Sequence, residues 1–600
     1  MSPVDVARYL MRRNAAFFVV LAVYALAAAT LYAIGWLHSD VIVTTAIFFI
    51  VVLGLDLLYG CAGLLSFGHV GFLAIGAYSV AVLHAQFALP PLVSMLIGLL
   101  VSAASGYLLG RVCLRLSGSY FMLGTLAFGI MVHAAITVGY TVTGGDGGLG
   151  GIPRPSLGGV VLSSDRSFGL MVWSLAVVLF WLTYSLSRSK VGRAARAIRS
   201  DELAAACLGV NVASLKMNLF VISACFASLG GSLFAMYNGA VHPDSFSLTT
   251  LLDLLLMMFF GGEGTIWGAL LGTTFMRLLP DITGALQGGK ILFSGVLFTI
   301  IIFALPRGIA GAIEDLIHRF SVRRRLGELG PAVGEFPFIA NSGANSGTLL
   351  ELNNVSRSFG GVLAVEDVSF RVDQGLIKGL IGPNGAGKST IMNVISGVLQ
   401  LHGGQVLLAG QPLNGLRPDQ VARRGIQRTF QHERLFAQLT IIENIMVGQE
   451  RGADGSLREI AACAVGLPGS VESEIAARSK AYQWLASLGL SRYAEARVGE
   501  VPHGLRKLVE VARCCAANPM ILLLDETAAG LNNIERQAFK KIIRMLRDRG
   551  LVMVIIEHDI DFIMDLCDEV CVVNFGRRIA DGPPAAIRKD PHVIEAYLGQ

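Results

Sequence analysis

One stretch decides the fold of the C-terminal part of this chain: Gly382-Pro383-Asn384-Gly385-Ala386-Gly387-Lys388-Ser389-Thr390. It satisfies the pattern G-x-x-x-x-G-K-[ST], follows the apolar run Leu376–Ile381 and precedes the helical stretch Thr390–Ser396. In that context, glycines allow backbone N–H groups to surround phosphates at the N-terminus of a helix. We therefore predict a nucleotide site, in which Lys388 reaches the β- and γ-phosphates and the Ser389 hydroxyl holds Mg²⁺.

Two apolar runs further along the chain end in polar residues that such a site needs. Ile521–Leu524 is followed by Asp525, which suits the Mg²⁺ shell, and Glu526, which suits polarisation of the attacking water. Val554–Ile556 leads to His558, which is expected to sense the γ-phosphate. An acidic pair at a strand end is often only structural, but the preceding phosphate loop favours the catalytic interpretation. Because such strands alternate with helical stretches, we expect an α/β domain with a largely parallel sheet.

The composition changes before this domain begins. The chain has 600 residues, of which 53% are hydrophobic and only 15% charged, whereas soluble globular chains carry about 25% charged residues. Charges are sparse up to about Pro306, and from about Gly347 the composition is that of a soluble enzyme. This excludes an ordinary soluble protein and predicts two environments, first a bilayer and then water. The net charge of +5 requires no nucleic-acid partner.

Apolar runs in the N-terminal part are long enough to cross a membrane, since about 20 residues span ~30 Å of hydrocarbon. We predict spans at Phe17–Trp36, Val41–Tyr59, Leu64–Val82, Leu92–Gly110, Phe121–Tyr140, Phe168–Leu186, Leu219–Tyr237 and Ile291–Leu305. Between the last two, Leu251–Leu279 is interrupted at Gly261-Gly262-Glu263-Gly264, which indicates two short helices or a re-entrant pair. The total is about 8–10 spans.

The positions of Lys and Arg predict the orientation, because these residues concentrate in cytoplasmic loops. The basic residues that we place inside are Arg8, Arg12, Arg13, Arg111, Arg115, Arg188, Lys190, Arg193, Arg196, Arg199, Arg319, Arg323, Arg324 and Arg325. The Gly-rich loop Thr143–Pro153 then lies outside, and the C-terminal domain is cytoplasmic. Residues 321–348 lack periodicity and contain Gly330-Pro331 and Asn341–Gly347, which indicates a linker between a membrane domain at 1–320 and the domain at 349–600.

Ionisable residues at membrane depth are functional candidates by default, although each could equally join two helices. These candidates are Asp56, His69, His133, Asp253 and Glu263. The glycines of a predicted helix at Gly60–Gly76 are interpreted as packing positions, with lining of a path as the alternative. The nine cysteines are scattered in mostly apolar surroundings, which is typical of core residues. No constellation predicts a metal cluster or a nucleophilic triad.

Taken together, these motifs resemble the ATPase domains of the ABC transporter family, over Leu349–Gln600. The resemblance implies that Phe359 stacks on adenine and that Gln431, in Arg428–Gln431, is the Q-loop residue that joins Ser389 and Asp525 around Mg²⁺. It also implies catalytic roles for Glu526, His558 and Gln431, and it gives Asn532 the D-loop position. The tail Glu595–Gly599 and the run Thr527–Asn532 are similar to the branched-chain amino-acid transporter branch.

One motif departs from the family pattern. The family signature reads Leu-Ser-Gly-Gly-Gln, or Leu-Ser-Tyr-Gly-Gln in that branch, whereas the aligned residues here are Val501-Pro502-His503-Gly504-Leu505. Pro502 removes a hydroxyl and a backbone N–H, and Leu505 removes an amide. In the family, the signature of one subunit completes the ATP site on the partner's P-loop. The resemblance therefore implies a sound P-loop with a weak signature, which favours a heterodimer with a second ATPase over a homodimer.

The N-terminal part resembles permeases of branched-chain (hydrophobic) amino-acid ABC importers, over about Ala46–Pro306. The similarity is carried by Gly60–His69, Gly118–Phe121, Gly144–Leu149 and Leu254–Gly272. The stretch Arg196–Lys216 is similar to the cytoplasmic coupling loop of importers, with Glu202, Ala205 and Gly209 at the matching positions. Such a loop would seat a short helix in a groove of an ATPase domain; a plain basic loop is the alternative.

The predicted fold class is a polytopic α-helical membrane domain followed by an α/β P-loop NTPase domain of ABC type. The resemblance implies a fused subunit of an importer that uses ATP and Mg²⁺ to take up branched-chain or other hydrophobic amino acids across a bacterial inner membrane. It also implies a second permease, a second ATPase subunit and an extracytoplasmic solute-binding protein as partners. The alternatives are the same architecture carrying urea, short amides or aromatic acids, a half-size exporter, and an ATP-gated channel or membrane-anchored regulatory ATPase.

Overall fold

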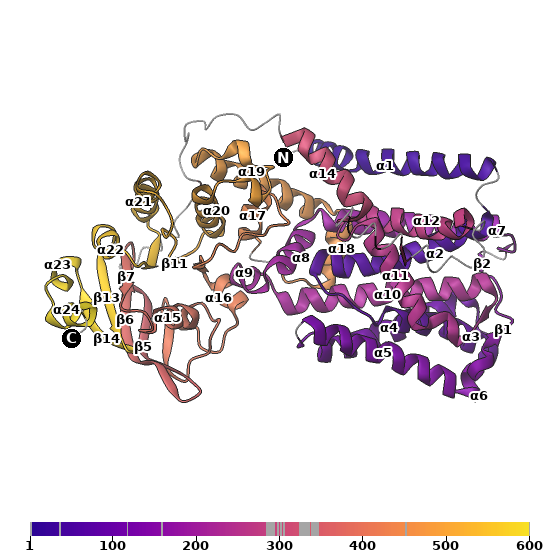
Figure 1. The fold of residues 1–600 in the computed structure, drawn as a ribbon, viewed down its shortest axis with the longest axis horizontal. Helices are drawn as coiled ribbons and strands as arrows, with labels where there is room; N and C mark the ends of the chain where they lie inside the picture. The colour runs from indigo at the N-terminus through magenta and orange to yellow at the C-terminus, as the bar shows by residue number, and fades with distance from the viewer. Residues whose placement is uncertain are drawn as a thin grey trace. The chain divides into compact units, whose positions relative to one another are not determined.

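The structure is a computed structural model that describes residues 3–34, 38–116, 118–157, 160–283, 295–296, 299, 303, 307–322, 337, 347–450 and 453–598. The chain forms two compact units, shown in Figure 1. Unit 1 comprises Met1–Arg199, Ala213–Arg324 and Gly455–Glu472, and unit 2 comprises Ser200–Val212, Arg325–Asp454 and Ser473–Gln600. The predicted linker at 321–348 lies almost entirely outside the described residues. The units therefore differ from the predicted domains by two short segments that belong to the opposite unit.

Unit 1 is helical. Its helices are α1 (Pro3–Ala33), α2 (Ser39–Asp56), α3 (His69–Phe87), α4 (Pro91–Cys113), α5 (Gly118–Val138), α6 (Tyr140–Thr143), α7 (Asp165–Ser187), α8 (Lys190–Ser200), α10 (Val212–Asn238), α11 (Leu248–Gly261), α12 (Ile266–Thr283), α14 (Gly308–Val322) and α18 (Leu457–Val465). Among the described residues, 6 helices are long and apolar enough to cross a membrane, or up to 7 if a bent helix pair counts as one span. Within the unit, α2 packs against α7 and α12, and α3 packs against α4 and α5 (Figure 1).

The predicted span Leu64–Val82 corresponds to α3, but the prediction that this helix begins at Gly60 or Leu64 is wrong. The preceding helix ends in a π-helical turn, η1 (Leu57–Cys61), and the next helix begins only at His69. A side chain at Gly60 would lie 2.5 Å from the backbone of Gly264, so this turn is pressed against another segment. The residues that follow form no helix, and a distant segment contacts them, since Phe67 N–H donates to the Thr125 hydroxyl at 3.0 Å.

The predicted interruption within Leu251–Leu279, as two short helices or a re-entrant pair, is confirmed as a break between α11 and α12. The chain turns between them at Gly262, whose φ of +112° is open to glycine. The two helices contact through their backbones, because a Cβ at Gly272 would lie 1.9 Å from the Met257 carbonyl oxygen. With 14 residues, α11 is only about 21 Å long at 1.5 Å per residue. The predicted span at Ile291–Leu305 falls almost wholly outside the described residues.

Two loops of unit 1 meet in a short antiparallel pairing. Strand β1 (Leu149–Gly150) pairs with β4 (Ala240–Val241), and they lie beside the 3₁₀ turns η2 (Gly145–Gly147) and η3 (Pro243–Phe246). A second short pair joins β2 (Ser156–Leu157) and β3 (Val160–Val161). The β1–β4 pairing connects the Gly-rich loop, which the Lys and Arg pattern places outside the membrane, with the loop that follows α10.

Unit 2 contains two sheets. The larger has the order β10-β11-β12-β7-β13-β14 and is parallel except for the last pair. Its strands are β10 (Ile426–Arg428), β11 (Ile521–Asp525), β12 (Val552–Ile556), β7 (Ile377–Ile381), β13 (Glu569–Asn574) and β14 (Arg577–Gly582). The smaller sheet is antiparallel, with strands β6 (Val362–Asp373), β5 (Thr348–Phe359), β8 (Gly403–Leu408) and β9 (Gln411–Pro412) in that order.

Helices and 3₁₀ turns complete unit 2. They are α9 (Glu202–Cys207), α15 (Lys388–Ile395), α16 (Pro418–Arg424), α17 (Ile441–Gly448), η4 (Ser491–Tyr493), η5 (Val498–Glu500), α20 (His503–Ala516), α21 (Asn533–Asp548), α22 (Ile560–Leu566), α23 (Pro584–Ile587) and α24 (Pro591–Leu598). Helix α19 (Pro468–Ser487) begins in unit 1 and continues into unit 2.

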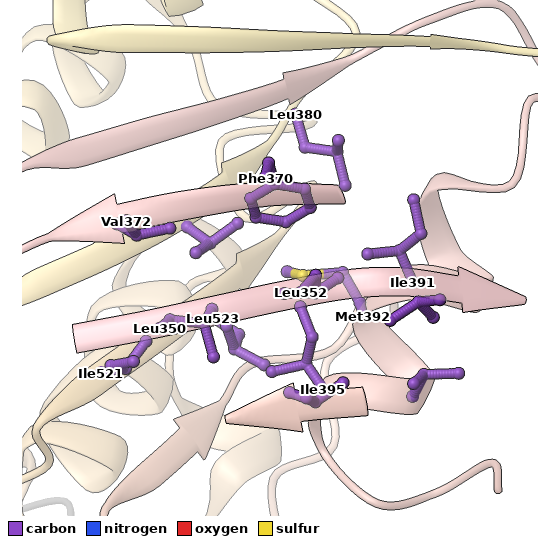
Figure 2. Packing of buried hydrophobic residues seen from close by; sticks show 14 of the residues in the cluster. Leu350, Leu352, Phe370, Val372, Leu380, Ile391, Met392, Ile395, Ile521 and Leu523 are labelled. Atoms are coloured by element: carbon purple, nitrogen blue, oxygen red, sulfur yellow. The ribbon is translucent and has the colours of Figure 1, made fainter. Parts of the chain in front are cut away.

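The core of unit 2 fixes the helix that begins in the phosphate loop. Figure 2 shows Leu352 and Phe370 of the antiparallel sheet, Ile391 and Ile395 of α15, and Leu523 of the parallel sheet in one buried cluster. Each of these side chains is at most 3% exposed. Helix α15 therefore packs against both sheets, and this packing fixes the position of the loop at its N-terminus.

Candidate ATP site and coupling segment

The phosphate loop spans Gly382–Thr390, from the end of β7 into the first turn of α15. Its glycines are required by space as well as by conformation: a Cβ at Gly382 (φ +154°) would lie 2.0 Å from the Val573 carbonyl oxygen. At Gly387 (φ +98°) the corresponding distance to the Ala364 carbonyl oxygen is 2.4 Å. The middle of the loop, at Asn384 and Gly385, is exposed. The loop thus offers exposed backbone at a helix N-terminus, which suits an anion.

Lys388 lies within this loop. Its Nζ donates to the carbonyl oxygens of Gly382 at 2.7 Å and of Pro383 at 2.8 Å. Burial lowers the pKa of the Lys388 ammonium, while the nearby Glu526 and Asp525 act in the opposite direction. Ser389 and Thr390 follow in the first turn of α15, and Ser389 is exposed there. The ammonium and the hydroxyl are thereby both presented at the start of the helix.

Two of the three predicted catalytic residues contact the carboxylate of the third. Glu526 accepts a hydrogen bond from Gln431 Nε2 to its Oε2 at 2.8 Å, and His558 Nε2 lies 2.9 Å from its Oε1. Glu526 follows β11 with φ +48°, a left-handed conformation that is costly for a residue with a side chain. Its backbone N–H donates to the Ile556 carbonyl oxygen at 2.8 Å, which holds the turn in place.

Asp525 is the last residue of β11 and is 3% exposed. Its Oδ2 accepts from Arg428 Nη2 at 2.8 Å, and Arg428 Nη1 donates to Asn393 Oδ1 on α15 at 2.6 Å. The other oxygen, Oδ1, is buried and has no hydrogen-bond partner among the described residues. A buried carboxylate oxygen without a partner is costly on its own, and a hard cation with its water shell would satisfy it. The donor set therefore fits Mg²⁺, although the predicted ligands Ser389 and Gln431 are not joined to Asp525 by any hydrogen bond.

Phe359, the predicted adenine contact, is the last residue of β5 and is 44% exposed. The Arg357 guanidinium lies 5.0 Å from its ring centroid. Phe359 pairs in register with Val362 on β6, two residues before Ala364, whose carbonyl oxygen faces Gly387 of the loop. An exposed aromatic ring near the phosphate loop can stack on a base.

The degenerate signature forms the start of α20. Pro502 is the N-cap residue, and both it and His503 are exposed. Gly504 is pressed against the residues after the D-loop, because a Cβ there would lie 2.3 Å from a Glu535 carboxylate oxygen. Leu505 is half-buried. In the D-loop, the Asn532 side chain accepts from Glu535 N–H at 2.9 Å and caps α21.

Sequence reasoning missed a buried carboxyl beside the catalytic cluster. Glu557, which precedes His558, accepts the Ala528 N–H at 2.6 Å and is 7% exposed. Burial raises its pKa from 4.5 to about 7; the hydrogen bond from Ala528 opposes this shift and the charge of Glu526 adds to it. Its place in an apolar run gave no signal that it would differ from an ordinary strand-end acid.

The predicted coupling residues lie in α9 and the turn after it, within unit 2. Ala205 is fully buried, Glu202 is exposed in the first turn, and Gly209 has φ +97°. The carbonyl oxygen of Gly209 accepts from Arg423 Nε of α16 at 3.1 Å. Burial raises the pKa of the Cys207 thiol to about 12. The segment is therefore a partly buried helix that contacts α16, rather than a plain solvated loop.

A second anchor of this segment was not foreseen. Asp201 caps α9 by accepting the Ala204 N–H at 2.8 Å, and it also accepts from Arg434 Nη1 at 2.8 Å. The Arg434 guanidinium lies 4.7 Å from the centroid of the Phe430 ring, the residue before Gln431. The segment that carries Gln431 is thus tied directly to the N-terminus of α9. Because 233 positions separate Asp201 from Arg434, no local pattern predicts this pair.

The ionisable candidates of the membrane unit differ in their surroundings. His69 Nε2 lies 2.9 Å from Ser223 Oγ, which ties α3 to α10. Asp56 accepts the Gly264 N–H at 2.8 Å, and Glu263 accepts from Arg199 Nη2 at 2.8 Å. His133 lines a cavity of about 210 Å³ together with residues of α3, α5 and α11. Asp253 lies on an exposed face of α11.

The fold and the site define a class of protein: an apolar helical membrane unit in one chain with a P-loop ATPase of ABC type. Three family models match the chain. They are "Branched-chain amino acid transport system / permease component" over residues 37–305, "ABC transporter" over 365–529, and "Branched-chain amino acid ATP-binding cassette transporter" over 577–600.

Curated relatives match the two parts separately. The chain is 39% identical over 253 residues to the high-affinity branched-chain amino acid transport ATP-binding protein BraF of Pseudomonas aeruginosa, covering 42% of this chain and 98% of that protein. It is 32% identical over 293 residues to the permease protein LivM of the high-affinity branched-chain amino acid transport system of Salmonella typhimurium, covering 45% of this chain and 69% of that protein. A solved nucleotide-free ATP-binding cassette from an ABC transporter is 29% identical, with 42% of this chain and 100% of that chain covered and a TM-score of 0.38.

The chain therefore belongs to the branched-chain amino acid ABC transporter family, and it joins the permease and the ATPase in one polypeptide. It is a multi-pass membrane protein with an ATP-binding ABC domain. Because its relatives are separate permease and ATP-binding components of transport systems, it works with partner subunits.

Proposed function

We propose that this chain is the fused permease and ATPase subunit of an importer that takes up branched-chain or other hydrophobic amino acids at the expense of ATP and Mg²⁺. The observation that carries the ATP-dependent part is the convergence of Gln431 and His558 on the Glu526 carboxylate, one residue after a buried Asp525 with a free oxygen. The cargo class is supported by the similarity to BraF and LivM, which are components of branched-chain amino acid transport systems.

In the proposed mechanism, backbone N–H groups of Gly382–Thr390 bind the phosphates, and Lys388 exchanges its loop carbonyls for phosphate oxygens. Asp525 would hold Mg²⁺, together with Ser389 and Gln431; the bound ion would neutralise charge on the β- and γ-phosphates. Glu526 orients the attacking water and accepts its proton, and His558 holds the Glu526 carboxylate and contacts the γ-phosphate. Phe359 stacks on the adenine.

The coupling step follows from the bonds of the Q-loop segment. If Gln431 moves toward the γ-phosphate when ATP binds, Phe430 and Arg434 move with it, and Arg434 draws on the N-terminus of α9 through Asp201. Helix α9 is continuous in sequence with α8 and α10 of the membrane unit. ATP-dependent closure would therefore switch the permease between outward and inward access, and hydrolysis would reset it.

The proposed assembly contains a second permease, a second ATPase subunit and an extracytoplasmic solute-binding protein in a bacterial inner membrane. The N-terminus and the ATPase domain are cytoplasmic in this proposal. The exposed Pro502 and His503 support the heterodimer, because they would meet the partner's phosphate loop without the hydroxyl and amide of an intact signature. A homodimer would carry this defect in both sites.

The proposal is tested by the ATPase activity of the full chain in lipid nanodiscs. It is measured alone, with co-purified partner subunits, and with solute-binding proteins loaded with leucine, isoleucine or valine. We expect stimulation only when the partners and a loaded binding protein are both present, with the Glu526→Gln variant as the inactive control. Stimulation by proteins loaded with urea, a short amide or an aromatic acid would reassign the cargo. Vigorous activity of the chain alone, insensitive to any binding protein, would overturn the importer and favour an exporter.

A further inference from the structure

One segment of the ATPase sequence is built into the membrane unit. Residues Gly455–Glu472 belong to unit 1, although the chain on either side of them, Arg325–Asp454 and Ser473–Gln600, belongs to unit 2. The segment contains α18 and the first residues of α19. It contributes nothing to the ATP site, and the coupling role assigned to α9 does not involve it.

Polar contacts hold the start of this segment against the cytoplasmic ends of the permease helices. Glu459 forms an ion pair with Lys190, the first residue of α8, and the Glu459 side chain is 11% exposed. The other Glu459 oxygen accepts the Gly455 N–H at 3.1 Å. The Gly455 carbonyl oxygen accepts from Asn218 Nδ2 of α10 at 2.6 Å. Both polar groups of the Gly455 backbone are thus satisfied, one by α18 and one by the permease.

Close packing reinforces these bonds. Gly455 has φ +65°, and a Cβ there would lie 2.8 Å from the Leu215 backbone, so only glycine fits against α10. Ile460 and Cys463 are the buried residues of α18, and this helix packs against α7. Cys463 is hydrogen-bonded with Ser189, at the junction of α7 and α8. The side of α18 that carries Leu457 is exposed.

The orientation of α18 also favours the ion pair. Ser456 caps the helix by accepting the Glu459 N–H at 3.3 Å, which places Glu459 in the first turn. A carboxylate is stabilised there by the positive end of the helix dipole. Glu459 is therefore fixed by its own helix before it meets Lys190, and an ion pair between pre-positioned groups loses less side-chain entropy than a mobile surface pair.

We propose that α18 is a permanent anchor of the ATPase on the permease, at the α7–α8 junction, which acts in addition to α9. The interaction surface consists of Gly455, Glu459 and Cys463 on the ATPase segment, with Lys190, Ser189 and Asn218 as its permease partners. Helix α8 leads from this anchor directly into α9. The anchor therefore holds the start of α8 in place while the ATPase moves α9. The anchor makes the motion of α9 act on α8 instead of displacing the whole permease.

The permanence of the contact is tested by cross-linking in the full transporter. Ser189→Cys introduces a thiol beside the native Cys463, and copper–phenanthroline oxidises the two thiols to a disulfide. A protease site inserted between residues 322 and 347 then separates the halves on a non-reducing gel unless they are cross-linked. We expect the same cross-link yield without nucleotide and in the ATP-trapped Glu526→Gln background. The matched control is Ser189→Cys with Cys463→Ser. No cross-link, or a yield that falls with ATP, would overturn the anchor.

The function of the anchor is tested by charge reversal. Glu459→Lys places two cations together, and we expect the stimulation of ATPase by partners and loaded binding protein to fall by about five-fold or more, a typical size for a coupling between sites. The unstimulated activity should stay within about two-fold, because no group of the ATP site changes. The double variant Lys190→Glu with Glu459→Lys should regain most of the stimulation, which a merely misfolded helix would not. Full stimulation in the single variant would overturn the proposal.

Discussion

Glu526 shows how the fold fixes a reactive group. Its left-handed backbone costs of order 1–3 kcal/mol, and the Ile556 carbonyl and two side-chain partners maintain it. Glu526→Gln removes the acceptor of the water's proton but preserves shape. We expect ATP hydrolysis to fall by about 10²–10⁴-fold, the usual range for a general base, with ATP binding unchanged. Phosphate release and equilibrium binding of a fluorescent ATP analogue measure the two effects. Unchanged hydrolysis in the full assembly would show that another group is the base; exposed Glu595→Gln is the control.

Glu557 predicts a pH dependence of stability. Its pKa is about 7 in the folded protein and 4.5 ordinarily, so the folded state keeps a proton that the unfolded chain has lost. The contribution of the protonated Glu557 to the free energy of unfolding is complete below pH 4.5. It is lost as the pH rises through about 7, by about 3 kcal/mol at most. Relative to Glu557→Gln, the wild type should lose stability across this window. Thermal melts of the ATPase unit at a series of pH values measure the difference. Parallel curves for the two proteins would contradict the raised pKa.

At the residue scale, sequence reasoning succeeds where chemistry requires a fixed local pattern. Lys388 and Glu526 stand at fixed places beside a glycine-rich loop and a strand end, so their proximity could be predicted from order and spacing. Arg428 could not, because its role depends on Asn393 and Asp525 meeting in space. The pKa of Glu557 depends on how deeply its side chain is buried. The apolar residues before it in the sequence do not predict that burial.

The start of α20 is an element whose sequence is poorly suited to its position. Pro502 occupies the N-cap without a side-chain hydrogen bond, where Ser would typically add about 1 kcal/mol. We expect the double variant Pro502→Ser with Leu505→Gln to raise turnover of the assembled transporter if the degenerate site limits the cycle. Steady-state ATPase and substrate uptake are the measurements, and Pro502→Ala is the control without a capping hydroxyl. Unchanged turnover would show that this site does not limit the cycle.

The end of α8 links two breaks in the membrane helices. Arg199 donates to the Gly60 carbonyl oxygen at 2.8 Å and to Glu263 at 2.8 Å, and its guanidinium lies 5.0 Å from the Tyr59 ring centroid. The π-helical turn and the α11–α12 turn are thus joined to the helix that leads into α9. The end of α8 and these two turns therefore form one shared contact.

Arg199→Gln should therefore weaken coupling. It removes the charge-assisted hydrogen bond to Glu263 and the guanidinium group that also reaches Gly60. Arg199→Lys should recover only part of the coupling, since one ammonium cannot reproduce the geometry of the guanidinium. We expect stimulated ATPase to fall by about five-fold or more, with unstimulated activity retained. The double variant with Glu263→Gln should be no worse than Arg199→Gln alone if the two act as a pair. Additive losses would show that the residues act separately.

Contacts between distant segments explain which helix boundaries the sequence could not predict. The run from Gly60 to Gly76 has the composition of a membrane helix, and hydropathy alone supports a span starting at Leu64. The helix breaks because Gly60 is pressed on Gly264 and Thr125 takes the Phe67 N–H, both from distant segments. The break within Leu251–Leu279 was predictable, because the interrupting glycines are local.

The two compact units of the molecule do not divide the chain at the boundary between permease and ATPase. Permease and ATPase are separate proteins among the relatives, and here each compact unit contains one short segment from the other part of the chain. The exchanged segments contain α9 and α18. Because of them, we expect the permease part and the ATPase part of the chain to associate even without a covalent link. Fusion makes such an association intramolecular, which adds an effective concentration to it.

The exchanged segments predict how the divided molecule behaves. When residues 1–322 and 347–600 are co-expressed as separate chains, we expect them to co-purify and to retain ATPase stimulation by partners and binding protein. Asp201→Ala removes the Arg434 pair and the α9 cap, so it should sharply reduce co-purification of the divided protein, while the fused chain cannot dissociate and keeps more of its activity. The ratio of the two losses measures what the fusion contributes. Equal losses in both forms would show that Asp201 serves coupling alone, and failure of the wild-type halves to associate would show that the covalent link is essential.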